Sequence, residues 1–148
     1  MLGCGLAARW LATLSGPTMF DYTLLAYLHL ATVLPAFVLG TALLCWRQKG
    51  SPAHRRWGRC YMVLMLLTAL LSLAMPARVG PALFGHFGFI HLLSVLVLYS
   101  VPQAWQAARQ GRVRAHRSAM VSLYVGGLLV AGALAWMPGR MLHGWLFG

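Results

Sequence analysis

The chain has 148 residues, of which 60% are hydrophobic and 9% are charged; 12 basic residues and one acidic residue give a net charge of +11. The surface of a soluble domain needs about a quarter of all residues to be charged, so this composition excludes an ordinary soluble globular protein. The basic residues lie in short clusters between apolar runs. This pattern is typical of membrane topology signals and argues against nucleic-acid binding.

Four apolar runs predict four transmembrane helices. Each is close to the roughly 20 residues that cross about 30 Å of hydrocarbon. The third is the least apolar, because Pro102, Gln103 and Gln106 lie in its last turns. The predicted spans are Tyr22–Trp46, Gly58–Met75, Phe87–Ala107 and Ala119–Met137. We interpret the weakly apolar residues 1–18 as an interfacial leader or a misassigned start, and residues 19–148 as one four-span domain.

The basic residues predict the orientation of the chain. Nine of the 12 flank the first and third connections between spans, whereas Arg9, Arg78 and Arg140 lie on the opposite side. The positive-inside rule therefore places both basic connections in the cytoplasm, near anionic lipid headgroups, and both termini outside. The nine residues are Arg47, Lys49, Arg55, Arg56, Arg59, Arg109, Arg112, Arg114 and Arg117.

An internal repeat relates the two halves of the chain. A shift of 62 residues aligns 29–78 with 91–140 and leaves 17 of 50 positions identical, including the His29-Leu30 and His91-Leu92 pairs. Each unit, about 22–80 and 85–142, contains two spans and is predicted to form a helical hairpin. Two spans per unit leave both copies in the same orientation, so we expect a pseudo-two-fold axis along the membrane normal.

Five motifs occur in order at the predicted helix boundaries. They are HLATVLPAF at 29–37, HRRWGR at 54–59, GHFGFIHLLS at 85–94, AHR at 115–117 and MPGRMLH at 137–143. Together these motifs resemble a family of bacterial predicted membrane proteins, domain of unknown function 2306, over about residues 22–147. The resemblance implies a multi-pass protein of the bacterial inner membrane with four spans, and it implies no activity.

The first and third spans each contain a histidine at matching repeat positions, His29 and His91, about one and a half turns inside the outer boundary. An ionisable side chain inside a span usually faces the bundle interior and serves a function. Two imidazoles facing each other at equal depth could hold a haem b iron or a metal ion. Arg78 and Arg140 would then bind an anionic group such as a haem propionate. The alternatives are that each imidazole only bonds a backbone carbonyl, or that the pair serves a proton or quinone site.

Further histidines extend this hypothesis to both sides of the membrane. His86 and His143 lie on the same outer side as His29 and His91, near Met75 and Met137, and this set of soft ligands would suit copper. His54 and His116 open the second and fourth spans on the inner side. They form a candidate second site, or they contact anionic headgroups.

The sequence therefore predicts an all-α, four-helix transmembrane bundle built from two tandem hairpins. It contains no carboxylate pair, activated nucleophile or phosphate-binding glycine loop, so no catalytic constellation is expected. The preferred function is a histidine-ligated haem or metal protein with an electron-transfer role. The alternatives are a small transporter or proton-coupled channel, and a non-catalytic assembly partner, with a homodimer formed through stripes of small residues.

Overall fold

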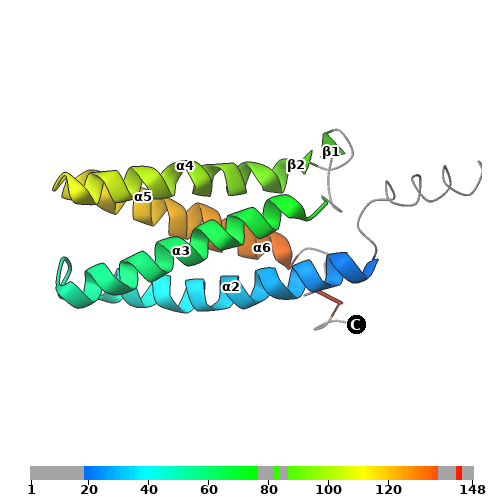
Figure 1. The fold of residues 1–148 in the computed structure, drawn as a ribbon, viewed down its shortest axis with the longest axis horizontal. Helices are drawn as coiled ribbons and strands as arrows, with labels where there is room; N and C mark the ends of the chain where they lie inside the picture. Colours follow the sequence, from blue (N-terminus) through cyan, green and yellow to red (C-terminus); the bar gives the residue numbers. More distant parts are fainter. Residues whose placement is uncertain (1–18, 77–81, 84–86, 137–142, 145–148) are drawn as a thin grey trace, which may run out of the picture.

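The computed structural model describes residues 19–76, 82–83, 87–136 and 143–144. These residues form a bundle of long helices that lie side by side (Figure 1). The helices are α2 (Met19–Cys45), α3 (Pro52–Ala74), α4 (Phe89–Arg109) and a fourth rod made of α5 (Val113–Tyr124), the π-helical segment η1 (Val125–Val130) and α6 (Ala131–Ala135). Two-residue antiparallel strands, β1 (Ala82–Leu83) and β2 (Phe87–Gly88), precede α4. The sequence predicted the helices but not this short ladder.

Local signals set where the helices of each hairpin begin. Ser51 caps α3, because its hydroxyl accepts the backbone N–H of His54 at 3.2 Å, and Pro52 occupies the first turn. Gly50 and Gly111, one in each basic connection, adopt positive φ angles of 83° and 69° that favour glycine. Helix α3 therefore begins before the predicted span, since the cap lies in the basic segment and not at the apolar boundary.

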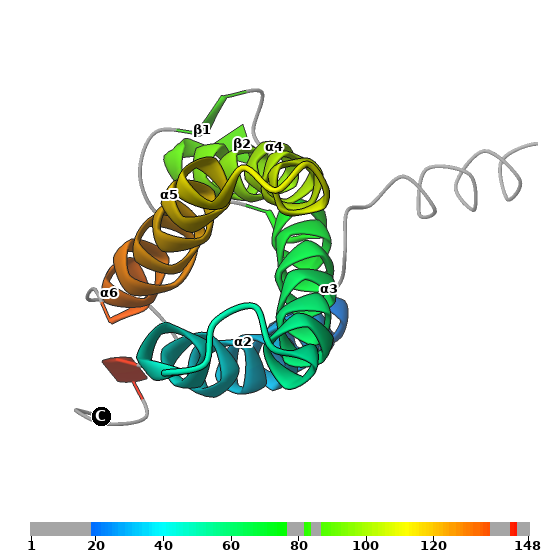
Figure 2. The ribbon, with the colours of Figure 1, turned by 90° about the vertical axis from the view of Figure 1, so that its left-hand side faces the viewer.

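The helices follow one another around the bundle in the order α2, α3, α4 and α5, so α2 lies across from α4 and α3 across from α5 (Figure 2). Neighbouring helices in this order pack against each other. Both basic connections lie at one end of the bundle, and the start of α2 and the strands lie at the other (Figure 1). The nine predicted inner basic residues therefore gather at a single end.

The buried core is narrow and lies along the inward faces of the helices. Its largest fully buried side chains are Tyr61, Met65 and Leu123. Many other large apolar side chains are exposed on every helix, among them Val38, Leu70, Leu92 and Leu129. An apolar surface this extensive is not found on soluble monomers and is the surface that lipid covers.

Among the described residues, three helices are long and apolar enough to cross a membrane: Tyr22–Cys45, Pro52–Ala74 and Val113–Ala135. Helix α4 is not among them, although it lies in the same bundle. Its final turns carry Gln103 and Gln106, the residues that made the third predicted span the weakest. The finding confirms a membrane-type helical protein with three candidate spans among the described residues.

A widened turn interrupts the fourth rod at η1. A side chain at Gly127 would place its Cβ 2.8 Å from Met65 Cε and 2.9 Å from Val97 Cγ2. The backbone of η1 therefore packs directly against side chains of α3 and α4. Such π-helical segments often occur at functional sites.

Candidate histidine sites

His91 is buried, with 4% of its surface exposed, at the third residue of α4. Its Nδ1 accepts the backbone N–H of Gly88 at 3.0 Å, and its Nε2 donates to the carbonyl of Met75 at 3.0 Å. The first bond exists because α4 begins at Phe89, so the amide of Gly88 has no partner within the helix. The imidazole thus joins the end of α3 to the start of α4.

His29 lies well inside α2 and is part of a polar network with α3. The Thr68 hydroxyl donates to Thr32 Oγ1 at 2.9 Å, and the Thr32 hydroxyl donates to the His29 carbonyl at 2.8 Å. The imidazole lies close enough to the backbone of Thr68 for the two to interact electrostatically. Its Nδ1 is buried and has no hydrogen-bond partner among the residues that the structure describes. A buried polar nitrogen without a partner is unfavourable, which makes it a candidate contact for a ligand, a proton or a water molecule.

The two outer histidines do not occupy matching environments. Both lie against α3, but His29 lies near the backbone of Thr68, whereas His91 bonds to the carbonyl of Met75, seven residues further along. That separation corresponds to roughly 10 Å along a helix. The sequence predicted that the two rings would face each other at equal depth. They engage α3 at different levels instead, because His91 is held at a helix start and His29 within a helix.

His54 and His116 open α3 and α5, which lie across the bundle from each other (Figure 2). His116 Nδ1 donates to the carbonyl of Ala104 at 2.9 Å. Its imidazole therefore turns toward α4 and not toward the surrounding lipid. His54 Nδ1 is buried without a hydrogen-bond partner, and the ring lies close enough to His116 and Lys49 for their charges to interact. Both imidazoles therefore lie at the inner end of the bundle, on helices that are across from each other.

The remaining predicted site residues are only partly described. His143 is half-buried in a short helical stretch, His143–Gly144, and takes part in further interactions. His86, Arg78 and Arg140 lie outside the described residues, as do Met137, residues 1–18 and the side chain of Asp21. Within the part of the chain that is described, no three His, Cys, Asp or Glu side chains gather into a metal site. The four-histidine copper site stays a prediction.

A tyrosine pair near the inner end was missed by the sequence analysis. Tyr61 is 1% exposed, and its hydroxyl has no hydrogen-bond partner. Tyr124 bonds through its hydroxyl to Thr41 Oγ1 at 2.7 Å and stacks on Phe37, thereby joining α5 to α2. Gly40 lets both rings approach the backbone of α2. The repeat carried a usable signal, since Tyr61 aligns with the apolar Leu123 and is a polar exception in its half.

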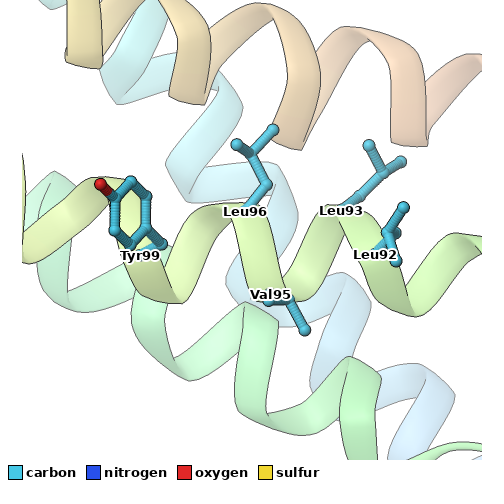
Figure 3. A pocket seen from close by; sticks show the side chains of 5 residues that line it. All are labelled: Leu92, Leu93, Val95, Leu96 and Tyr99. Carbon is cyan, nitrogen blue, oxygen red and sulfur yellow. The ribbon is translucent and has the colours of Figure 1, made fainter.

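A shallow hollow on α4 is lined only by apolar atoms of Leu92, Leu93, Val95, Leu96 and Tyr99 (Figure 3). No polar group converges on it. It lacks the few placed polar groups that orient a small-molecule ligand, so we assign it to the lipid-facing surface.

The helical bundle, its apolar exterior and its interior polar residues define an integral membrane protein. A family model described as "Predicted membrane protein (DUF2306)" matches residues 26–145, so the chain belongs to this family of membrane proteins of unknown function. This confirms the family that the motifs indicated. No curated protein and no solved structure matches the chain.

Proposed function

We propose that the chain is a four-span membrane redox protein in which histidine pairs bind haem. The inner pair, His54 and His116, carries the proposal. Histidines that bind a metal usually donate their other ring N–H to a carbonyl or carboxylate, which fixes the ring and leaves the ligating nitrogen free. His116 has this arrangement, because Nδ1 donates to Ala104 and Nε2 has no hydrogen bond among the described residues.

The position of the inner pair supports the same chemistry. Cofactor sites of helical bundles are built from side chains on facing helices, and α3 and α5 face each other across this bundle (Figure 2). His54 contributes a half-buried ring whose Nδ1 is buried and has no hydrogen-bond partner among the described residues. His54 and His116 would hold a haem iron through their free ring nitrogens, and the bound haem would supply one-electron redox chemistry.

The outer pair, His29 and His91, is proposed as a second haem site, which the two rings would form only after the His91 imidazole has left Met75 and moved to the level of His29. His91 Nδ1 lies 3.3 Å from the carbonyl of Gly88, so a change of tautomer would let Nδ1 donate there. Nε2 would then leave Met75 and become available to iron. Arg78 and Arg140 are proposed to bind the propionates of this haem, as the sequence suggests. Two haems at two levels of the bundle would carry electrons across the membrane.

The proposed topology has four spans, with the basic connections in the cytoplasm and both termini outside the bacterial inner membrane. It is supported by the packing of α4 between α3 and the fourth rod, because a helix that runs beside spanning neighbours has to cross with them. The gathering of both basic connections at one end agrees with the positive-inside rule. The pseudo-two-fold relation of the hairpins belongs to the same proposal.

A second candidate function is a proton-coupled transporter or channel. The observation that favours it is a set of three buried polar atoms without a hydrogen-bond partner among the described residues, His29 Nδ1, His54 Nδ1 and Tyr61 Oη. Ionisable groups inside a membrane bundle often form proton relays. In this alternative the histidines exchange protons and bind no iron.

The test is purification in mild detergent from cells supplied with haem, followed by absorption spectroscopy and elemental analysis. We expect a Soret band and iron in the preparation. The band should be reduced in His54→Ala, His116→Ala, His29→Ala and His91→Ala, and unchanged in the control His143→Ala. A colourless preparation without iron would remove the haem proposal and favour the transporter. Copper without iron would favour the predicted copper site on the outer side, formed by His29, His86, His91 and His143.

A further inference from the structure

Besides the histidine pairs, the outer face of α5 carries a polar surface. It lies on the side of the helix that faces away from the imidazole of His116. A surface hollow of about 430 Å³ is lined by Arg114, Arg117, Ser118, Val121 and Ser122. The spacing of these residues places them on one face of the helix, over two successive turns. All five are exposed. The hollow is therefore lined by two arginine and two serine side chains with apolar surface beside them, and it is open to a ligand that approaches from the side of the bundle.

The charge of this hollow is not balanced within the protein. The chain has one acidic residue, Asp21, which lies in α2 at the opposite end of the bundle (Figure 1). The structure shows no hydrogen bond or ion pair from Arg114 or Arg117 to another described residue. Arginine presents a planar fork of donors that suits phosphate oxygens, so the hollow is complementary to a phosphate group.

The same face becomes apolar further along the rod, toward the middle of the bundle. Val121 borders the hollow, and Val125 and Leu129 follow at four-residue spacing with 44% of each side chain exposed. Polar groups at the helix start therefore lead directly to a lipid-facing apolar strip. A ligand that fits both parts has an anionic head and an acyl chain.

We propose that Arg114, Arg117, Ser118 and Ser122 bind the phosphate headgroup of an anionic phospholipid, with its acyl chain along Val121, Val125 and Leu129. The site lies at the end of the bundle where the basic connections gather, which is where a headgroup meets a spanning helix. A zwitterionic lipid would bring its own cation close to the two arginines, so an anionic lipid binds more tightly. The site is independent of haem.

Native mass spectrometry of the full chain in mild detergent tests this proposal. Phosphatidylglycerol, phosphatidylcholine with the same acyl chains, and inorganic phosphate are titrated separately. The test variant is Arg114→Gln with Arg117→Gln. The matched control is Arg55→Gln with Arg56→Gln, which removes the same charge from α3 at the same end of the bundle but not from the hollow.

We expect one phosphatidylglycerol to bind preferentially to the unmodified chain. Its affinity should fall roughly 30-fold in the test variant, from about 1 kcal/mol for each arginine near the surface, and less than roughly 3-fold in the control. Ser118→Ala with Ser122→Ala keeps both charges and should weaken binding several-fold. This variant keeps the test decisive if the arginine variant does not fold.

Four outcomes would overturn the proposal. Equal losses in the arginine variant and its control would mean that only net charge matters. Equal binding of phosphatidylcholine would remove the selectivity for anionic lipids. Displacement of the lipid by inorganic phosphate at similar concentration would indicate a site for a free anion. A dimer that is lost only in the arginine or serine variant would assign this face to a second copy of the chain.

Discussion

His29 and His91 occupy the same position in the two halves of the chain, yet their surroundings differ. His91 lies in the first turn of α4, where the free amide of Gly88 and the carbonyl of Met75 engage both of its ring nitrogens. His29 lies well inside α2, where the backbone amides of the preceding turns are used within the helix, and its Nδ1 is left without a partner. The comparison shows that the position of a histidine relative to the start of its helix decides whether backbone groups can bond to its ring nitrogens. His91 lies close enough to a helix start for this, and His29 does not.

The inner histidines differ in a similar way. His116 has its Nδ1 fixed by the carbonyl of Ala104, whereas His54 has a buried Nδ1 without a partner. In both pairs, therefore, one imidazole is oriented by backbone and the other keeps an unsatisfied nitrogen. In a redox site the oriented ring would set the geometry, and the other ring would adjust to the cofactor.

The largest expected effect in the haem-free protein is that of His91→Ala. Removing the imidazole leaves the Gly88 amide and the Met75 carbonyl without partners and breaks the link between α3 and α4. We expect the free energy of unfolding in detergent to fall by about 3 kcal/mol, against about 1 kcal/mol for His29→Ala, because the buried Nδ1 of His29 has no hydrogen bond to lose among the described residues. Chemical unfolding followed by circular dichroism measures both. Equal losses would contradict the comparison of the two copies.

A smaller effect is expected where the second hairpin packs closest to its neighbours. In Gly127→Ala the new methyl group meets Met65 and Val97. Met65 can move its flexible end, but the branched Val97 is stiff, so we expect destabilisation by about 2 kcal/mol. Gly132→Ala, further along the same rod, meets no atom within 4 Å and serves as the control. Thermal unfolding should separate the two variants, and the same midpoint in both would argue against tight packing at η1.

The smallest effects have opposite signs. Tyr124→Phe loses the hydrogen bond to Thr41 that joins the hairpins and should lower stability by about 1 kcal/mol. Tyr61→Phe removes a buried hydroxyl that has no partner, so it should be neutral or stabilise by up to about 1 kcal/mol. The chemical change is the same in both variants, so their difference in unfolding free energy reports only the surroundings. A clear loss in Tyr61→Phe would show that this hydroxyl has a partner in the native protein.

Sequence reasoning reached the helices and the family because both depend on long, regular patterns. Apolar runs located the helices. The basic residues predicted that the two connections lie at the same end of the bundle, as observed. Helix starts were less accurate, since Ser51 caps α3 within a basic segment that hydropathy assigns to a loop.

The candidate site was harder to predict, because it depends on single hydrogen bonds. The repeat suggested that His29 and His91 would be equivalent. It could not show that Gly88 has a free amide before α4, whereas its counterpart in the first half, Ala26, lies inside α2. The bond of His116 to Ala104 and the buried hydroxyl of Tyr61 depend on how α3, α4 and α5 pack. Local sequence patterns do not predict contacts of this kind, because the partners lie on segments that are far apart in the sequence.

The central claim is that two histidine pairs each bind a haem, and a redox titration of the purified protein followed at the haem absorption band tests it most directly. We predict two one-electron transitions in the unmodified chain. His116→Ala should remove one of them and His91→Ala the other, while His143→Ala keeps both. A protein that shows no transition after haem supply, or transitions that do not respond to either substitution, would contradict the claim.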